Sequence, residues 1–501
     1  MSIETLPPHV HTLVVGAGFG GIGMAATLLR EDPRADVLVI ERGDDVGGTW
    51  RVNTYPGAAC DVPSALYSFS FAPEPDWSKV HGTQDEIYAY LRRVAKEQGV
   101  TDRTMFGCEL RDAQWDDESA RWMVSTSRGD LTAEVLVSAT GALSTPTLPK
   151  VPGLESFRGK MFHSAQWDHD YDLTGKRVAV IGTGASAIQF VPAIVDTVGH
   201  LTLFQRTASW VMPKHDHTIA RPVRALYRRF PLAQKVVRAA VYGQKETYVV
   251  GMTRPFARRW LVPLFERRAL SVLDRQVADP ELRAKLTPKF RIMCKRILLS
   301  NDWFPAITRP DVTVVASGLT ALTENGVVDE AGNEYEVDTV IFGTGFTVTE
   351  PPVAQHIRGG DGRTLAETWN GSPSAYLGIA VHGFPNLFLM YGPNTNLGHS
   401  SIVYMLESQA AYIADALRAM RSRGLSAVEV TAGAQRTYNA ELDPALAGTV
   451  WNAGGCDSWY LDRKGRNSVM WPTFTWRYRA RTRQFDPENY LARPAAERIA
   501  A

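Results

Sequence analysis

Cysteine is scarce in this 501-residue chain. Only Cys60, Cys108, Cys294 and Cys456 occur, and no two of them form a C-x-x-C pair. The scattered spacing indicates neither a zinc site nor a redox pair. Few cysteines in a long chain are typical of a reducing cytoplasm, so we expect a cytoplasmic protein.

The chain also has little net charge and no long apolar run. It carries 54 Lys and Arg against 53 Asp and Glu, a formal net charge of +1, and nothing in that balance points to nucleic acid. No apolar stretch is long enough to span a bilayer. The polar start, MSIETLPPHVH, lacks the charged and apolar regions of a signal peptide. Because a single core rarely grows beyond about 300 residues, two or more domains are expected.

A glycine-rich turn near the N-terminus has the pattern of a dinucleotide site. The apolar strand Thr12–Val15 leads into a G-x-G-x-x-G formed by Gly16, Gly18 and Gly21, and a helix follows. The next apolar strand ends in Glu41, at the spacing expected for an acid that hydrogen-bonds a ribose. Strand, helix and acid together favour a nucleotide site with a free ribose over a turn that serves only packing.

A second glycine-rich turn follows the strand Arg177–Ile181. It contains Gly182 and Gly184, with Ala187 in place of the third glycine, and the next strand ends in Arg206 rather than in an acid. Arginine accommodates a ribose 2′-phosphate, so we expect FAD at the first turn and NADPH at the second. The alternative for Arg206 is a solvated charge at a strand end.

Residues 221–296 differ from the rest of the chain in charge. This window has 19 Lys and Arg against 5 Asp and Glu, a net charge of +14. Its prolines predict several short helices. The functional alternatives are a cap over the active site, a surface patch, or contact with an anionic membrane. We favour solvated helix faces over membrane contact, and we expect the interleaved aromatics Tyr227, Phe230, Phe256 and Trp260 to be core.

The whole pattern predicts an α/β fold with two Rossmann-like dinucleotide-binding domains, for FAD and NADP, and a helical insertion. Strand–glycine pieces at Thr140-Gly141 and Thr344-Gly345 indicate where the chain leaves the nucleotide domains. The stretch from Tyr376 on, with a helix over 400–423, is expected to complete the first domain. The predicted segments are 1–150 for the FAD domain, 151–215 for the NADP domain, 216–290 for the insertion, 291–370 for the second part of the NADP domain, and 371–501 for the second part of the FAD domain with the C-terminal loops.

Asp61 stands alone among small and apolar residues after the first nucleotide strand. A carboxylate in such a setting is usually paired with a cation, and Lys295 and Arg296 are the candidates. The alternative for Asp61 is a turn-forming residue ahead of Pro63. Trp50, in the same segment, offers a flat apolar face for a flavin ring.

Two longer patterns lie in and around these segments. F-x-G-x-x-x-H-x-x-x-W followed by Asp is matched by Phe157, Gly159, His163, Trp167 and Asp168. G-G-x-W-x-x-x-x-[FY]-P-G-x-x-x-D is matched by Gly47, Gly48, Trp50, Tyr55, Pro56, Gly57 and Asp61. With a glycine-rich turn on either side of the first pattern, residues 10–480 resemble the type I Baeyer–Villiger monooxygenases, a family within the class B flavin monooxygenases.

The resemblance implies an NADPH-dependent flavin monooxygenase. In that family NADPH reduces FAD, and the reduced flavin takes O2 to give a C4a-peroxyflavin while NADP+ stays bound. The peroxide attacks a ketone, and one oxygen is inserted next to the carbonyl to give an ester or lactone. The implied partners are a small-molecule ketone and O2. We expect a monomer or a small homo-oligomer that binds no nucleic acid.

The resemblance also implies roles for particular residues. Arg296 is the implied catalytic cation that stabilises negative oxygen, and Asp61 orients it. The residues implied to bind FAD are Gly16, Gly18, Gly20, Gly21, Glu41, Gly48, Thr49, Trp50, Cys60, Asp61 and Tyr67. Those implied to bind NADP are Gly182, Thr183, Gly184, Ala185, Ser186, Ala187, Ile188, Arg206, Thr207, Lys295 and Arg296, with Trp459 on a mobile loop that closes over it.

The fingerprint segment from Phe157 to Asp168 is expected to join the two domains rather than to make or break bonds. Phe157 and Trp167 would pack across the junction, and Gly159 would allow a turn between them. His163 would hydrogen-bond the backbone of the linker and couple the domains.

Other classes of protein fit the residues less well. Flavin N- or S-oxygenases, which act on amines or sulfides, carry a fingerprint that ends in Tyr or Phe rather than in Trp167-Asp168. A flavin disulfide reductase needs two cysteines beside the flavin, where only Cys60 is near. A non-enzymatic nucleotide sensor would not need Asp61 and Arg296. Ala59 stands where family members often have Arg, which changes the expected contacts at the active-site mouth.

Overall fold

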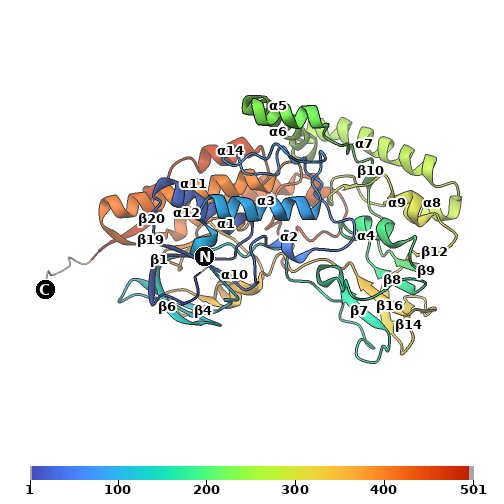
Figure 1. Cartoon of the computed structure of the whole chain (residues 1–501), viewed down its shortest axis with the longest axis horizontal. Coiled ribbons are helices and arrows are strands. Elements are labelled where there is room, and N and C mark those ends of the chain that lie inside the picture. The colour runs from blue at the N-terminus through green and yellow to red at the C-terminus, as the bar shows by residue number, and fades with distance from the viewer. Residues whose placement is uncertain (1–2, 496–501) are drawn as a thin grey trace.

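Two β-sheets lie towards opposite ends of an elongated molecule, and helices α5 (Arg221–Arg229), α6 (Pro231–Thr253) and α7 (Pro255–Gln276) run along one side (Figure 1). A computed structural model describes residues 3–495. The outer ends of the predicted segments 1–150 and 371–501 lie outside the described residues.

The first sheet draws its strands from widely separated parts of the chain. In spatial order they are β17 (Ile357–Arg358), β4 (Leu110–Asp116), β5 (Arg121–Thr126), β6 (Gly129–Ser138), β1 (His9–Val15), β2 (Val37–Glu41) and β3 (Thr104–Phe106), and β18 (Leu387–Leu389) also pairs with β6. Strands β1, β2 and β3 pair in parallel, and β2 is buried throughout, as expected of a strand covered on both faces. Helix α11 (Ile402–Arg423) packs on α1 (Phe19–Glu31), so the C-terminal part of the chain contributes to this half of the molecule.

The second sheet has five parallel strands, in the order β12 (Val312–Val315), β9 (His200–Phe204), β8 (Arg177–Ile181), β16 (Thr339–Phe342) and β7 (Lys160–His163). Edge strand β7 lies inside the fingerprint segment. The segment expected to join the two domains thus contributes a strand to the second sheet, a feature that the sequence did not predict, because the backbone of Lys160–His163 is paired with β16.

The other elements are short or lie outside these two sheets. The remaining strands are β10 (Val211–Met212), β11 (Leu298–Leu299), β13 (Leu319–Leu322), β14 (Gly326–Asp329), β15 (Glu334–Glu336), β19 (Leu425–Val430) and β20 (Tyr490–Pro494). The remaining helices are α2 (Thr49–Val52), α3 (Gln84–Glu97), α4 (Ala187–Ile194), α8 (Pro280–Leu286), α9 (Trp303–Ile307), α10 (Leu365–Trp369), α12 (Ala432–Ala447), α13 (Val450–Ala453) and α14 (Thr475–Arg481). None of the helices over residues 3–495 combines the length and apolar character needed to cross a membrane.

Strand β17 falls within the predicted NADP segment 291–370. It nevertheless pairs with β4 of the first sheet, through Ile357 and Ala113. The end of that segment therefore returns to the first sheet before residue 370.

The prolines of the insertion begin helices more often than they interrupt them. Pro222, Pro231, Pro255 and Pro280 stand in the first turns of α5, α6, α7 and α8, where a missing N–H leaves no helical hydrogen bond unmade. Helices α6 and α7 therefore run for 23 and 22 residues, and the prediction of only short helices is wrong.

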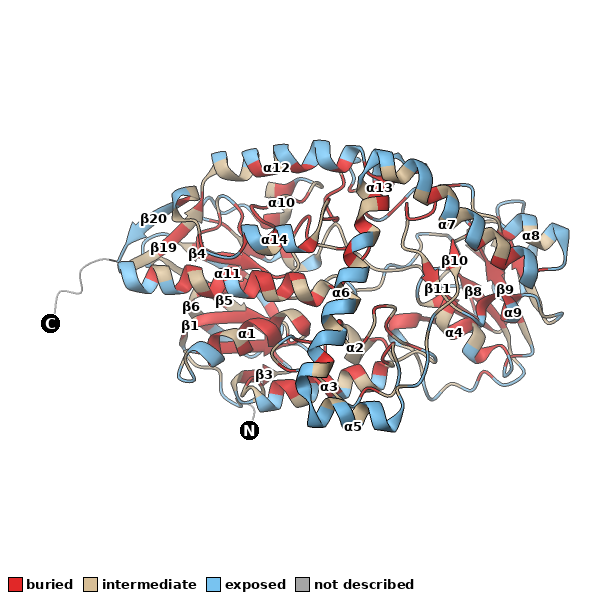
Figure 2. Cartoon of the chain, turned by 90° about the horizontal axis from the view of Figure 1, so that it is seen from above, coloured by how far each residue is buried: buried red, intermediate tan, exposed pale blue. Residues whose placement is uncertain are grey.

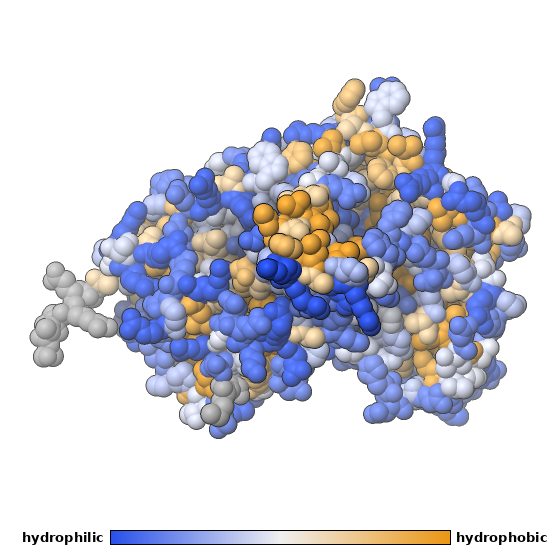
Figure 3. Space-filling model, turned by 45° about the horizontal axis from the view of Figure 1, so that its top comes forward, coloured by the Kyte–Doolittle hydropathy of each residue, from blue (hydrophilic) through white to orange (hydrophobic). Residues whose placement is uncertain are grey.

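Three aromatic side chains of the insertion lie on the surface. Phe230 is 55% exposed, Trp260 is 66% exposed and Phe256 is 82% exposed, so the expectation that they are core is wrong. Helix α6 alternates buried and exposed residues as it crosses the molecule (Figure 2). Apolar side chains gather over α5 and the start of α6, beside strongly hydrophilic ones, on the face seen in Figure 3.

Candidate active site

A cavity of about 1080 Å³ is lined by both glycine-rich turns. At the first turn Gly16 has φ +103°, and a Cβ there would lie 2.7 Å from the carbonyl oxygen of Ala139. Gly18 and Gly48 approach so closely that a Cβ on Gly48 would lie 2.9 Å from the Cα of Gly18. Bare backbone therefore forms this part of the wall, beside the start of α1, where unpaired N–H groups attract an anionic group.

The carboxylate of Glu41 is buried beside the first turn. It accepts the backbone N–H of Ala17 at 2.8 Å and that of Gly43 at 2.9 Å, and the guanidinium of Arg51 lies 3.8 Å away. Strand β2 thus ends in an acid that is fixed at the cavity wall, as a ribose-binding acid would need to be.

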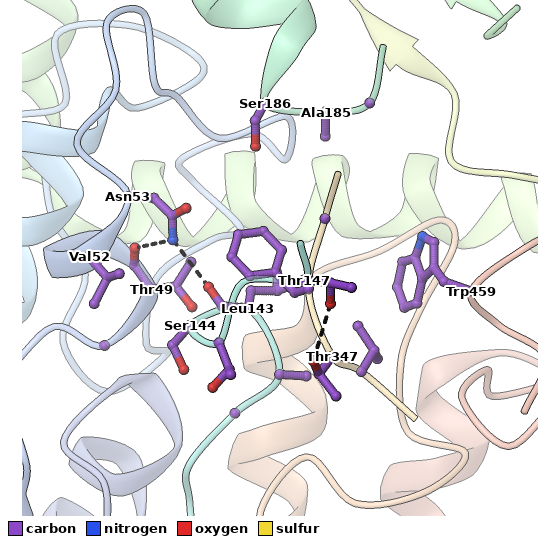
Figure 4. Close-up of a pocket in the computed structure, with 18 of the residues that line it drawn as sticks. Thr49, Val52, Asn53, Leu143, Ser144, Thr147, Ala185, Ser186, Thr347 and Trp459 are labelled. Atoms are coloured by element: carbon purple, nitrogen blue, oxygen red, sulfur yellow. Dashed lines mark hydrogen bonds between the residues drawn. The ribbon is translucent and has the colours of Figure 1, made fainter. Parts of the chain in front are cut away.

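The second turn has the same construction on the other side of the cavity. Gly182 has φ +106°, and a Cβ there would lie 2.6 Å from the carbonyl oxygen of Gly343. Helix α4 begins directly after Ser186, with no acidic residue in its first turn. Ala185 and Ser186 lie across the cavity from Thr347 (Figure 4). The backbone near α4 is therefore suited to a second anionic group.

Asp61 pairs with Arg296. Nε and one terminal nitrogen of Arg296 donate to different carboxylate oxygens of Asp61, each at 2.5 Å, in a bidentate pair. Burial alone would raise the pKa of Asp61, but the charge and hydrogen bonds of Arg296 outweigh burial and lower it. The charge of Asp61 in turn raises the pKa of Arg296 although burial opposes the shift. Both groups line the cavity as an ionised pair.

Two cations, Arg206 and Lys295, lie close enough at one corner of the cavity to influence each other, and Thr207 follows Arg206 in the cavity wall. The side chain of Arg206 is 73% exposed, and its carboxylate partner Asp457 is 3.9 Å away. Burial lowers the pKa of Lys295, an effect that Asp457 opposes and Arg206 increases. A phosphate at this corner would relieve the repulsion between the two cations.

A disulfide joins Cys294 to Cys456. The sequence did not predict this bond, because the two cysteines lie 162 residues apart and no local spacing indicates it. Cys294 lies two residues before Arg296, and Cys456 lies three residues before Trp459. Trp459 lines the cavity and is 42% exposed (Figure 4). The bond thus ties the segment that carries Arg296 to the segment that carries Trp459.

Most of the residues predicted to bind cofactors line the cavity, and three do not. Those that line it are Gly16, Gly18, Gly20, Glu41, Gly48, Thr49, Trp50, Cys60, Asp61, Tyr67, Gly182, Thr183, Gly184, Ala185, Ser186, Arg206, Thr207, Lys295, Arg296 and Trp459. A Cβ on Gly21 would lie 1.8 Å from the carbonyl oxygen of Gly16, so this glycine serves the packing of helix on strand. Ala187 and Ile188 are buried in the core of the second sheet.

The fingerprint residues are not among those that line the cavity. Phe157 is buried against the second sheet rather than between the sheets. A Cβ on Gly159 would lie 2.4 Å from a backbone carbonyl oxygen. The ring centroid of Trp167 lies 5.4 Å from that of Phe190, which in turn lies 6.0 Å from that of Tyr55 in the FAD segment. Of the two aromatics, Trp167 thus reaches towards the junction, whereas Phe157 does not.

His163 ends strand β7 as a buried side chain. Its Nδ1 accepts the backbone N–H of Ala165 at 3.1 Å, which confirms the expected bond to the linker backbone. Burial lowers the pKa of His163 to about 4, against a hydrogen bond with Gly345 that raises it, so the ring is neutral near pH 7. Asp168 pairs with Lys160 at 2.5 Å at the surface.

Several polar residues of the cavity wall were not predicted from the sequence. The side-chain amide of Asn53 donates to the carbonyl oxygens of Thr49 at 3.0 Å and Leu143 at 3.1 Å (Figure 4). The hydroxyls of Thr147 and Thr347 lie 3.2 Å apart. The two strand–glycine pieces noted in the sequence lead into these wall segments and were the available signal.

Comparison with known proteins identifies relatives over almost the whole chain. A model of the family described as flavin-binding monooxygenase-like matches residues 10–238. The chain is 49% identical over 495 residues to a Baeyer–Villiger monooxygenase of Pseudomonas aeruginosa, which covers 98% of this chain and 93% of the relative. It is also 49% identical over 500 residues to a Baeyer–Villiger monooxygenase of Streptomyces coelicolor, which covers 99% of this chain and 96% of the relative.

Solved structures share the arrangement of both sheets and the insertion. A cyclohexanone monooxygenase from Rhodococcus sp. Phi1 bound to NADP+ matches with a TM-score of 0.86 at 28% identity, covering 98% of this chain and 100% of that chain. An oxidised steroid monooxygenase bound to NADP matches with a TM-score of 0.84 at 29% identity, and the match covers 97% of this chain and 100% of that chain. On the sequence relatives, the fold and the cavity, the chain belongs to the Baeyer–Villiger monooxygenase family.

Proposed function

We propose that this protein is an FAD- and NADPH-dependent monooxygenase that inserts one oxygen atom of O2 next to the carbonyl of a small-molecule ketone and yields an ester or lactone. The observation that carries the proposal is the bidentate Asp61–Arg296 pair in the wall of a cavity that both glycine-rich turns line. The relatives of Pseudomonas aeruginosa and Streptomyces coelicolor, both named Baeyer–Villiger monooxygenase, support it.

The residues of the cavity fit both cofactors. FAD would be held by the bare backbone at Gly16, Gly18 and Gly48, with Glu41 on its ribose. NADPH would be held by the second turn, with its 2′-phosphate at the corner of Arg206, Thr207 and Lys295 and with Trp459 over it. When bound, NADPH supplies the reducing equivalents and the flavin activates O2.

Arg296 is the proposed catalytic cation. Oxygen insertion develops negative charge on oxygen at the substrate carbonyl, and a guanidinium fixed beside it lowers the energy of that charge. Asp61 holds one edge of the guanidinium, so the group need not reorganise during the reaction. Because the pKa of Arg296 is raised and that of Asp61 is lowered, the pair keeps its charges across the working pH range.

The Arg296→Ala variant tests this role. We expect reduction of the bound flavin by NADPH to persist within about tenfold and ester formation to fall by at least about a hundredfold, as when one group that stabilises an oxyanion is removed. Flavin absorbance and mass spectrometry of the product measure the two steps separately. Arg291→Ala is the matched control, because Arg291 pairs with Glu266 at 3.0 Å and should leave ester formation intact. Ester formation by Arg296→Ala at the parent rate would refute the role.

The division into domains is also a proposal. The FAD domain comprises 1–150 and 371–501, to which β17 is added, and the NADP domain comprises 151–215 with the part of 291–370 that precedes β17. The insertion occupies 216–290. A monomer or a small homo-oligomer remains the proposed state, which light scattering of the holoenzyme would establish.

The cytoplasm remains the proposed location, and the disulfide provides its test. Persistent disulfides are rare in reducing compartments, so Cys294 and Cys456 should be thiols in living cells if the location is correct. Alkylation at the moment of lysis, followed by mass spectrometry, would detect them. Recovery of Cys294 and Cys456 without the alkyl group and still joined as a disulfide would contradict a reducing location.

A further inference from the structure

The outward side of α5, α6 and α7 presents large apolar side chains to solvent. Leu226, Phe230, Leu232, Val236, Phe256 and Trp260 are each at least 46% exposed, and we call this surface the insertion face. Figure 3 shows apolar groups in more than one place on this side of the molecule, near the centre of the view and at its top. Apolar exposure gathered on one set of helices marks an interaction surface more often than scattered exposure does.

The charged side chains that the insertion itself exposes here have one sign, and one of them, Arg228, is paired with Asp76 of the FAD half. Between Arg221 and Arg268 the chain contains only two acids, Glu246 and Glu266, and neither is exposed. The exposed charged side chains of the same stretch are all basic: Arg221, Arg228, Arg229, Lys235, Arg254, Arg259, Arg267 and Arg268. The insertion face is therefore apolar and cationic together.

Basic and aromatic groups also meet within the insertion face. The guanidinium of Arg229 lies 5.4 Å from the ring centroid of Phe230, and that of Arg259 lies 5.8 Å from the ring centroid of Trp260. Aromatic rings next to cations are the combination found where a protein contacts the boundary between lipid head groups and acyl chains.

The inner side of α6 fixes which residues face outward. The amide of Gln234 donates to the carbonyl oxygen of Glu74 at 2.5 Å, and Arg238 donates to that of Ala65 at 2.8 Å. Further along, Glu246 accepts the backbone N–H of Thr475 at 2.9 Å. Because these contacts hold one side of the helix against the FAD half, Leu232 and Val236 cannot turn inward without breaking them.

We propose that the insertion face docks the protein peripherally on an anionic lipid surface. The apolar side chains would enter the head-group boundary, and the surrounding arginines would contact the lipid phosphates. A symmetric pair formed through this face would bring two sets of cations together and is disfavoured. Nucleic acid would satisfy the arginines but offers no partner for Leu232 and Val236.

The test is co-sedimentation of the FAD-loaded full chain with vesicles. We expect binding to vesicles of phosphatidylglycerol mixed with phosphatidylcholine, at least about tenfold weaker binding to phosphatidylcholine alone, and release by salt. Equal binding to both kinds of vesicle, or binding to neither, would overturn the proposal.

Variants test whether vesicle binding depends on the insertion face or on any exposed apolar residue. The double variant Phe256→Ser/Trp260→Ser should bind anionic vesicles at least about tenfold less tightly. Leu491→Ser is the matched control, because Leu491 is 58% exposed on β20, away from the insertion, and should bind like the parent. Retained flavin reduction by NADPH verifies that each variant is folded.

Sedimentation velocity without lipid tests the alternative that a second copy of the chain covers the insertion face. If the parent is a dimer that the double variant converts to monomer, and no vesicle binding is seen, a second copy is the occupant and the lipid proposal fails. A parent that binds anionic vesicles without any change of oligomeric state between parent and variant supports it.

Discussion

At the scale of single residues, Arg206 is proposed to distinguish NADPH from NADH. Its loss should remove a charge-assisted contact to the 2′-phosphate, so Arg206→Ala is expected to raise KM for NADPH about tenfold and leave KM for NADH unchanged. Steady-state oxidation of both cofactors measures the ratio. Arg463→Ala, which removes an exposed arginine paired with Glu350, should keep the parent ratio. An unchanged ratio in Arg206→Ala would show that the phosphate is bound elsewhere.

His163 should make the fold sensitive to mild acid. Its pKa in the folded protein is lowered by burial to about 4, whereas an unfolded histidine titrates near ~6.5. As the pH falls from ~6.5 towards 4, the unfolded chain binds a proton that the folded chain does not, so the free energy of unfolding decreases. The full gap corresponds to about 3 kcal/mol. Above ~6.5 the residue has no such effect.

The variant His163→Asn isolates this contribution. Asparagine can still accept the N–H of Ala165 but does not titrate, so the thermal midpoint should fall less steeply between pH 7 and pH 5 than in the parent. Differential scanning calorimetry at several pH values measures the slope. Parallel slopes in parent and variant would assign the acid sensitivity to other groups.

At the scale of elements, strand β7 depends on the glycine that precedes it. A Cβ on Gly159 would lie 2.4 Å from the carbonyl oxygen of Asp338 and 2.5 Å from the ring of Phe157. Gly159→Ala is therefore expected to lower the free energy of unfolding by about 1–3 kcal/mol. Gly243, within α6, has open space around it, and Gly243→Ala should raise stability by up to ~1 kcal/mol. Thermal unfolding compares the two, and a tolerated Gly159→Ala would show that the backbone yields there.

The sequence predicted the elements whose signal is local. Strand β8 matches its predicted range, Arg177–Ile181, and the helix predicted over 400–423 is α11, Ile402–Arg423. In both cases a continuous run of the chain contains both the apolar periodicity of the element and the residues that begin and end it. Strand β7 was missed because its four residues form a strand only by pairing with β16, which comes from a distant part of the chain.

The residues of the site could be predicted from the sequence, but which of them pair in space could not. Asp61 was expected beside Lys295 or Arg296, and only the fold, across 235 residues, brings Arg296 into the bidentate position. The exposure of Phe256 and Trp260 was mispredicted for the opposite reason. A helix reads as amphipathic or apolar from its sequence, but whether another layer covers it depends on the rest of the molecule.

At the scale of the whole molecule, α4 joins the NADP half to the FAD half. The side-chain amide of Gln189 accepts the hydroxyl of Tyr55 at 3.0 Å and donates to the carbonyl oxygen of Ala59 at 2.8 Å. A Cβ on Gly57 would lie 2.7 Å from the backbone oxygen of Gln189. These contacts end two residues before Asp61, so the joint between the halves also positions the proposed catalytic pair.

The bond between Cys294 and Cys456 closes a covalent ring around parts of both halves. The ring contains strand β16 of the second sheet and helix α11 of the first half, so the unfolded chain of both halves stays looped while the ring is closed. A cross-link over 162 residues restricts the unfolded chain by about 5 kcal/mol in a chain-entropy estimate. Adding a reductant should therefore lower the thermal midpoint by several degrees.

The response to reductant should disappear in Cys456→Ser and persist in Cys108→Ser, whose cysteine is buried and unpaired. A midpoint that ignores reductant in the parent would show that the ring contributes no stability. With the ring closed, the protein is expected to lose activity more slowly on storage. Its working lifetime would then follow the thiol chemistry of its surroundings, through a bond two residues from the arginine proposed to carry out the reaction.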